Sequence, residues 1–181
     1  MTDRAPYEPG PANLATVEKT AEDKWTLIVS KELRHAPQIV WNALTDPAQL
    51  REWAPFDATG SLDKPGTTVT FQWAGTPTSF ETTVRRADAP HALEYASPDM
   101  DLRWQLEPTP TGTRLTLWTN IDRNYISMGA AGWHIAFETL ERKLDGTPIP
   151  RIAGNDAVAF AGWQRLNADY ANQWDIKPPA W

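Results

Sequence analysis

The chain of 181 residues contains no cysteine. This absence excludes disulfides, thiol nucleophiles and thiolate metal ligands together. No run of about 18 apolar residues occurs, so no segment has the composition of a membrane-spanning helix. The first residues also lack the apolar core of a secretory signal peptide. We therefore expect a soluble, cytoplasmic protein that crosses no membrane.

The chain also has fewer basic residues than acidic ones. The chain has 17 Lys and Arg residues against 23 Asp and Glu residues, which gives a net charge of -6 and a pI near 5.0. Proteins that bind nucleic acids usually present a basic surface to the phosphate backbone. We therefore expect no nucleic-acid partner.

The sequence also lacks the common catalytic and metal-binding motifs. No Ser-His-Asp order, Gly-rich phosphate loop or HExxH motif is present. Only three histidines occur, His35, His91 and His134. Glu138 follows His134 by one helical turn, but a third ligand at suitable spacing is missing, so we expect neither a metal nor a cofactor. A surface ion pair is the favoured interpretation of His134 and Glu138, with a polar anchor at a cavity mouth or an acid–base pair as alternatives.

Aromatic residues, in contrast, are abundant, and ten of them are tryptophans. One tryptophan belongs to the clearest helical pattern of the chain, over residues 130–145. Gly146 and Pro148 end this predicted helix. Its narrow apolar face is made by Trp133, Ala136, Phe137, Leu140 and Leu144.

Most of the chain before this helix alternates as strands do. Strands are predicted at residues 13–20, 25–33, 69–73, 80–85, 91–96, 102–106 and 113–121. Two short helices, beginning at Pro37 and Pro47, interrupt them, and Asp46 is a plausible cap for the second. Connections this short predict an antiparallel meander.

The two ends of the chain are expected to lie outside this domain, which we place at residues 13–154. Residues 1–12 contain three prolines and predict a poorly ordered tail or a strap. Residues 155–181 predict a helical extension packed on the domain. The apolar side of its helix is expected to be Phe160, Trp163, Leu166, Tyr170 and Trp174.

The order of these elements resembles the helix-grip fold of the SRPBCC (START/Bet v 1-like) superfamily. The stretch from Ala36 to Pro47, followed by Leu50 and Trp53, is similar to a signature of its branch named after the activator of Hsp90 ATPase. Residues 112–117, GTRLTL, resemble the penultimate strand of that branch, and Gly132-Trp133 resembles the start of its terminal helix. The resemblance covers roughly residues 24–145. It implies an α+β fold in which a curved antiparallel sheet, two short helices and a long C-terminal helix enclose a cavity. Residues 155–174 lie past the resemblance, and their own pattern predicts an extra helix.

In that fold the inward residues would form a hydrophobic ligand-binding site between the sheet and the long helix. A solid core without a cavity is the alternative. The expected lining residues are Trp53, Phe56, Phe71, Trp73, Phe80, Trp104, Leu115, Leu117, Trp133, His134, Phe137 and Leu140.

Three functions fit this architecture. The sequence favours non-enzymatic binding of a small hydrophobic or aromatic molecule, because no catalytic set is evident. A cyclase or aromatase would need acid–base residues in the cavity, for which His134, Glu138 and Arg103 are the candidates. A chaperone regulator would instead act through its surface. Trp118 is expected on the outer face of the sheet, where either the tail or a second subunit of a homodimer could cover it.

Overall fold

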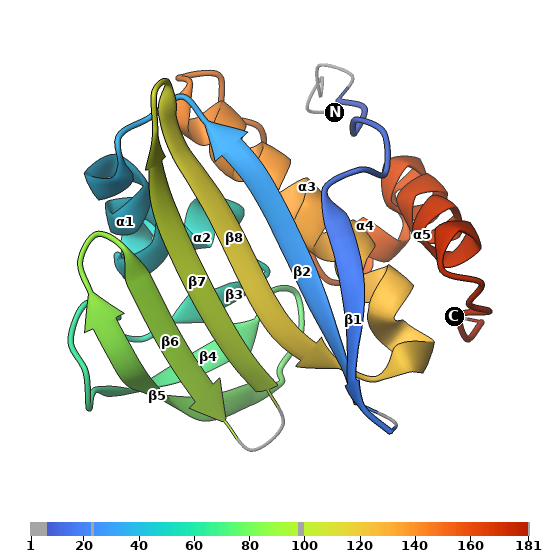
Figure 1. The fold of residues 1–181 in the computed structure, drawn as a ribbon, viewed down its shortest axis with the longest axis horizontal. Helices are drawn as coiled ribbons and strands as arrows, with labels where there is room; N and C mark the ends of the chain where they lie inside the picture. Colours follow the sequence, from blue (N-terminus) through green and yellow to red (C-terminus); the bar gives the residue numbers. More distant parts are fainter. Residues whose placement is uncertain (1–6, 23, 98–99, 181) are drawn as a thin grey trace.

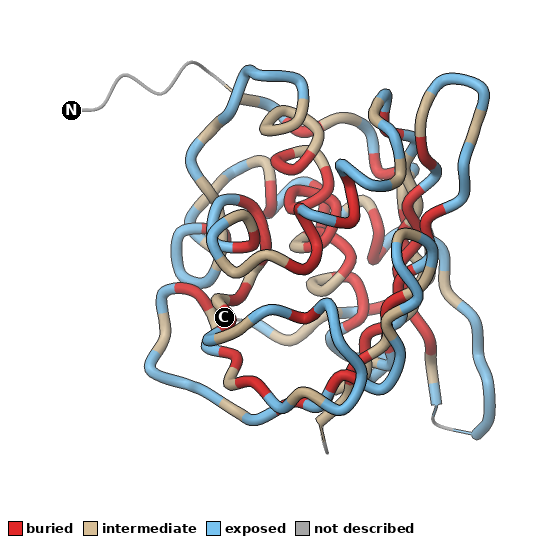
Figure 2. Tube along the Cα trace, turned by 90° about the vertical axis from the view of Figure 1, so that its left-hand side faces the viewer, coloured by how far each residue is buried: buried red, intermediate tan, exposed pale blue. Residues whose placement is uncertain are grey.

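The computed structural model describes residues 7–22, 24–97 and 100–180. Their framework is an antiparallel sheet of eight strands in the order β1-β2-β8-β7-β6-β5-β4-β3. The sheet curves around one long helix, and the buried positions gather where the helices meet it (Figures 1 and 2). The strands are β1 (Ala15–Ala21), β2 (Lys24–Leu33), β3 (Phe56–Ala58), β4 (Thr68–Trp73), β5 (Ser79–Asp88), β6 (Ala92–Ser97), β7 (Met100–Thr109) and β8 (Gly112–Ile121).

The two short helices lie between β2 and β3, as the sequence predicts. They are α1 (Pro37–Thr45) and α2 (Pro47–Trp53), and each begins with a proline in its first turn. The Asp46 carboxylate accepts a hydrogen bond from the Ala48 N–H at 3.0 Å, so it caps α2 where the chain breaks between the two helices. This break directs the ring of Trp53 into the core, where it is buried.

The long helix α3 (Ile126–Leu144) begins four residues before the start predicted from the sequence. A short 3-10 turn, η1 (Arg123–Tyr125), precedes it. The apolar pattern missed the first turn because Ser127 and Gly129 interrupt it, although Ile126 is fully buried. Within the described part of the chain, no helix is long and apolar enough to cross a membrane.

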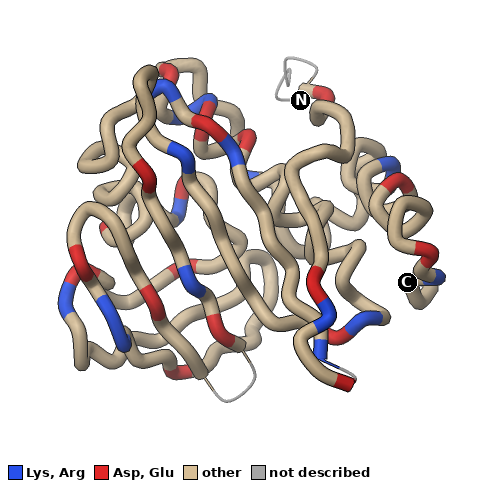
Figure 3. Tube along the Cα trace, in the orientation of Figure 1, with Lys and Arg blue, Asp and Glu red and all other residues tan. Residues whose placement is uncertain are grey.

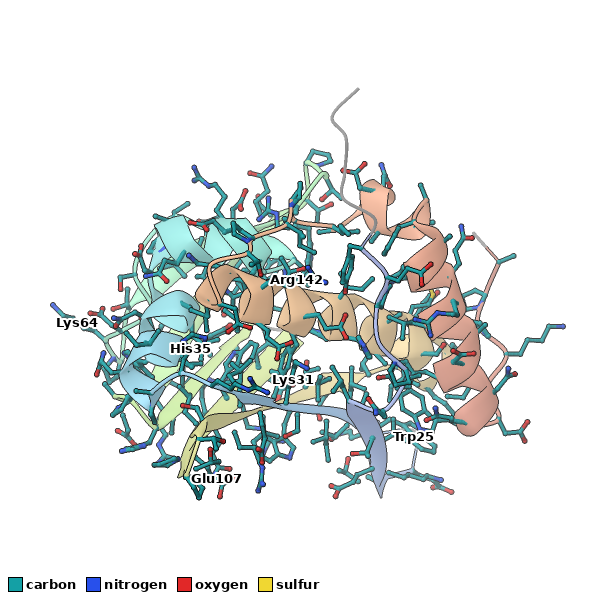
Figure 4. The ribbon with its side chains drawn as sticks, turned by 90° about the horizontal axis from the view of Figure 1, so that it is seen from above. Trp25, Lys31, His35, Lys64, Glu107 and Arg142 are labelled. Atoms are coloured by element: carbon teal, nitrogen blue, oxygen red, sulfur yellow. The ribbon has the colours of Figure 1, made fainter. Side chains whose placement is uncertain are left out.

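Ion pairs fasten the C-terminal end of α3 to the sheet and to α2. The Lys31 ammonium on β2 lies 3.2 Å from the Glu141 carboxylate, and Lys143 lies 3.0 Å from Glu52. His35 also contacts Asp145 through its Nε2 atom at 2.7 Å. Figure 4 labels Lys31 and His35 on the sheet side of this end, and Figure 3 marks the other charged residues along strands, loops and helices.

The C-terminal extension forms two helices, α4 (Asn155–Val158) and α5 (Ala161–Gln173). The sequence predicts one continuous helix here, but the chain turns at Phe160. The ring of Phe160 stacks on that of Tyr7, with 5.9 Å between the ring centroids. Helix α5 lies against α3, where the Ser127 hydroxyl donates a buried hydrogen bond of 2.8 Å to Asn167. The extension is therefore packed on the domain through polar as well as apolar contacts.

The described part of the N-terminal segment, residues 7–14, forms a strap across α3 and α5. Arg165 on α5 donates hydrogen bonds to the carbonyls of Pro9 and Gly10, and Gln173 donates one to the carbonyl of Ala12 at 2.7 Å. The sequence predicts a poorly ordered tail or a strap over residues 1–12, because prolines carry no apolar periodicity. Residues 7–12 lie as a strap, held by hydrogen bonds to their carbonyls that the sequence pattern does not reveal. Residues 1–6 lie outside the described residues.

Candidate functional site

A cavity of about 520 Å³ lies between the sheet and the N-terminal half of α3. Its walls come from the end of α2 and the turn after it, the ends of β4, β7 and β8, helix α3, and the extension. The lining residues are Trp53, Pro55, Trp73, Ala74, Thr76, Met100, Thr119, Asn120, Ile121, Asp122, Gly129, Gly132, Trp133, Ala136, Ile152, Ala153, Gly154, Ala157, Val158 and Trp163.

The space exists because α3 presents small residues to it. Gly129, Gly132 and Ala136 recur at positions i, i+3 and i+7 of the helix and line the cavity beside Trp133. A Cβ atom built on Gly132 would have one neighbour within 4 Å, the Trp163 indole nitrogen at 4.0 Å. The sequence analysis missed these residues because it searched for large apolar side chains. Their helical spacing is the signal that could have revealed them.

One wall of the cavity comes from the extension. Six of the lining residues lie between Ile152 and Trp163. The backbone approaches β4 closely at Gly154, which has φ +59° and where a Cβ atom would lie 2.3 Å from the Ala74 carbonyl oxygen. Only glycine fits this contact, because the left-handed backbone and the close carbonyl both exclude a side chain. The extension therefore closes the cavity as well as covering α3.

Only three of the residues expected to form the site line this cavity: Trp53, Trp73 and Trp133. Most of the others pack against one another in a solid part of the core, where a cavity was expected. The Phe56 and Phe71 rings stack with their centroids 4.2 Å apart, and the Trp104 and Phe137 rings stack with their centroids 5.9 Å apart. The expected residues that do not line the cavity are Phe56, Phe71, Phe80, Trp104, Leu115, Leu117, His134, Phe137 and Leu140.

His134 faces α5 rather than the sheet. Its side chain is 0% exposed, so the interpretation of a surface pair with Glu138 is wrong. The Nε2 atom lies 3.1 Å from the Glu138 carboxylate, and the Nδ1 atom lies 2.8 Å from the Tyr170 hydroxyl. An ionised carboxylate only accepts, so Nε2 donates to Glu138. The periodicity placed His134 on the flank of α3 correctly, but it did not reveal that α5 covers this flank.

Glu138 links His134 to the N-terminal strap. Its carboxylate accepts from the Tyr7 hydroxyl at 2.5 Å and from the Gly10 N–H at 3.0 Å. Burial alone would raise the pKa of Glu138, but the hydrogen bonds from His134, Tyr7 and Gly10 outweigh it and hold the pKa below its usual value. Burial raises the pKa of Tyr170 to about 12. The network thus joins the strap, α3 and α5, and it lies outside the cavity.

The other acid–base candidate also lies away from the cavity. Arg103 on β7 is exposed and pairs with Trp118 on β8, on the outer face of the sheet. Among the described residues, no three His, Asp or Glu side chains come close enough to hold a metal ion. The cavity lining itself is mostly apolar, with four tryptophans and one carboxylate, that of Asp122.

A curved antiparallel sheet, two short helices after its second strand and a long helix against its inner face define the helix-grip class of α+β proteins. Comparison with known families is consistent with this class. The family model described as "Activator of Hsp90 ATPase homolog 1-like protein" matches residues 34–145. The chain therefore belongs to this family, as the resemblance in the sequence predicts. No curated protein matches the chain.

Solved structures share the fold at low sequence identity. CalU16 from Micromonospora echinospora is 19% identical, with a TM-score of 0.66 over 89% of this chain and 94% of its own. A conserved protein of unknown function from Enterococcus faecalis is 14% identical, with a TM-score of 0.67 over 89% and 90% of the two chains. The AHSA1-like protein from Aeromonas hydrophila is 18% identical, with a TM-score of 0.55 over 67% and 92%. At these identities the likeness concerns the fold alone.

Proposed function

We propose that this protein binds a small hydrophobic or aromatic molecule in the cavity between the sheet and α3, without converting it chemically. The observation that carries the proposal is the cavity of about 520 Å³, which lies within the size range of small-molecule sites. Its four tryptophans and small apolar residues offer contact area to a ring system.

The chemistry of the lining supports binding rather than catalysis. General acid–base catalysis needs a titratable group within hydrogen-bonding reach of the ligand. His134 and Glu138 are engaged with Tyr170, Tyr7 and Gly10 on the other side of α3. Asp122 lines the cavity, but one of its carboxylate oxygens already accepts from the Asn124 N–H at 2.7 Å.

A panel of small aromatic compounds tests the proposal by calorimetry. We expect dissociation constants in the micromolar range, since burial of apolar area drives binding. Trp73→Leu removes a ring from the cavity wall and should weaken binding by about tenfold or more, which corresponds to about 1.4 kcal/mol.

Trp118→Leu is the matched control, because Trp118 is half-buried on the outer face of the sheet. It should leave the affinity unchanged. If no compound binds, or if both variants lose affinity equally, the cavity is not the site. If a compound is recovered chemically altered, the protein is an enzyme instead.

A further inference from the structure

Trp133 carries a hydrogen-bond donor that has no acceptor among the residues that the structure describes. The side chain is 8% exposed, and its indole N–H makes no hydrogen bond to any described residue. Among those residues, the side-chain atoms that are sealed from solvent without a partner are the hydroxyls of Thr82 and Thr109. The Trp133 nitrogen therefore keeps accessible surface. Since the ring packs against Trp104 and Phe56 inside the domain, this surface opens into the cavity that the residue lines.

Two other tryptophans of the wall, Trp53 and Trp73, differ from Trp133. The Trp53 indole N–H donates to the Ala43 carbonyl at 3.0 Å, so it is already engaged. Trp73 is only half-buried, so its side chain keeps more contact with water than that of Trp133. A donor that is nine-tenths buried loses most of its contact with water, and leaving it unpaired costs free energy. Trp133 therefore favours a ligand that brings an acceptor.

The charges of the wall restrict the ligand further. No Lys, Arg or His belongs to the described residues that line the cavity. A negative charge placed there would lose its hydration and gain no cationic partner. The Asp122 carboxylate at the wall and the net charge of -6 would repel an anion in addition.

From these observations we infer that the ligand is an uncharged aromatic molecule carrying a hydrogen-bond acceptor, such as a carbonyl oxygen, which accepts from the Trp133 indole N–H. This inference rests on the proposed function and adds the chemical class of the ligand. The rings of the wall supply affinity, and the Trp133 donor sets the position of the acceptor within the cavity. Polar groups left unpaired by a wrong ligand are the usual source of such discrimination.

Four probes of similar size test the inference on the full chain. They are an acetylnaphthalene, the isopropenylnaphthalene that replaces its carbonyl oxygen with a methylene group, naphthoate, and a naphthyl trimethylammonium salt. Calorimetry gives the affinity of each for the wild type. We expect the ketone to bind tighter than naphthoate and tighter than the ammonium salt, by about tenfold or more.

Trp133→Phe separates the donor from the ring. It keeps an aromatic ring in the wall and removes the N–H, so the affinity ratio of ketone to hydrocarbon should fall by about fivefold or more. Trp53→Phe is the matched control, since it also replaces an indole of the wall with a smaller phenyl ring but removes an N–H already bound to Ala43. There the ratio should stay at its wild-type value, even if both affinities drop.

A measurement on the wild type covers the case in which Trp133→Phe does not fold. In proton–nitrogen NMR spectra, the Trp133 indole resonance should move downfield on addition of the ketone and should not do so with the hydrocarbon. Equal ratios in the wild type and Trp133→Phe, or no downfield movement, would overturn the inference while leaving the proposed function intact. Tighter binding of naphthoate or of the ammonium salt would also overturn it. Failure of all four probes to bind would overturn both.

Discussion

Trp133 lies where α3, the sheet and the cavity meet. Its ring contacts Trp104 and Phe56 edge-on, with ring centroids 5.6 and 6.3 Å apart. Trp133→Ala should therefore lower the free energy of unfolding by about 3–5 kcal/mol, the usual cost of deleting a buried aromatic ring. Urea unfolding measures this loss.

Ile39→Ala on α1 is the control for the Trp133 substitution. Ile39 is 47% exposed, so its truncation should change stability by less than about 0.5 kcal/mol. A loss below about 1 kcal/mol for Trp133→Ala would contradict the packing of α3 on the sheet described above.

Glu138 gives the molecule a pH-dependent contact. Its folded-state pKa lies below the ordinary value of 4.5, because hydrogen bonds to the carboxylate outweigh the effect of burial. The stabilisation is therefore fully present above pH 4.5 and is lost as the pH falls through the lower folded-state value. His134, Tyr7 and Tyr170 are the titratable groups that face it, and the charged groups Arg142 and Arg165 lie near Tyr7.

Glu138→Gln tests this dependence. The neutral amide cannot accept from all three donors, so the variant should lose about 1–3 kcal/mol of stability at pH 7. The difference from the wild type should shrink as the pH is lowered below 4.5. Denaturant unfolding between neutral and acidic pH measures both effects, and a difference that stays constant with pH would contradict the assigned role of the carboxylate.

At the level of elements, α3 combines a tightly packed C-terminal half with a small-residue face over the cavity. Gly132→Leu should fill part of the cavity, since a Cβ atom at this position meets only the Trp163 indole nitrogen at 4.0 Å. We expect probe affinity to fall by about tenfold or more. Stability should hold or rise, because glycine within a helix costs about 1 kcal/mol relative to alanine.

Gly132→Ala provides the comparison for that prediction. Its single methyl group should raise the melting temperature while leaving most of the affinity. If Gly132→Leu binds the probes as the wild type does, the cavity over α3 is not where they bind.

The extension makes a separate prediction. A chain ending at Gly154 loses the cavity wall formed by Ala157, Val158 and Trp163, together with the buried partners of His134 and Ser127. It should be less stable by several kcal/mol, on the order of two buried aromatic side chains, and should bind no probe. A chain ending at Lys177 keeps α4 and α5 and should match the full-length protein. Equal stability of the two truncated chains would show that the extension does no packing.

The sequence predicted the elements of this fold well and the candidate site poorly. Strands and helices can be read from the sequence because their buried residues recur at a fixed local spacing. Val69, Phe71 and Trp73 alternate as strand residues do, and the apolar residues around Phe137 recur at helical spacing. The position of the cavity depends instead on the missing side chain at Gly132. It also depends on Ile152–Gly154, which reach β4 through a loop without periodicity. Such contacts between distant segments leave no local pattern.

At the scale of the whole molecule, ligand binding and stability should be linked. A ligand that binds only the folded chain raises its free energy of unfolding by about 2.7 kcal/mol at 100 times the dissociation constant. The acetylnaphthalene probe should therefore raise the melting temperature of the wild type, and Gly132→Leu should show a much smaller increase. A calorimetric scan at several probe concentrations measures this.

The homodimer suggested by Trp118 stays a prediction, which sedimentation equilibrium can test.

The order of the strands also has a consequence for how this protein is made. Strand β2 pairs with β8, from Leu33 opposite Thr113 to Trp25 opposite Ile121, so each pair joins residues 80 to 96 positions apart in the chain. A ribosome adds about 5–20 residues per second, so β2 waits roughly 4 s or longer for its partner. During that interval the β1–β2 hairpin presents an unpaired edge and an uncovered apolar face. The nascent chain therefore passes through a period of exposure to aggregation that ends only when β8 and α3 have been synthesised.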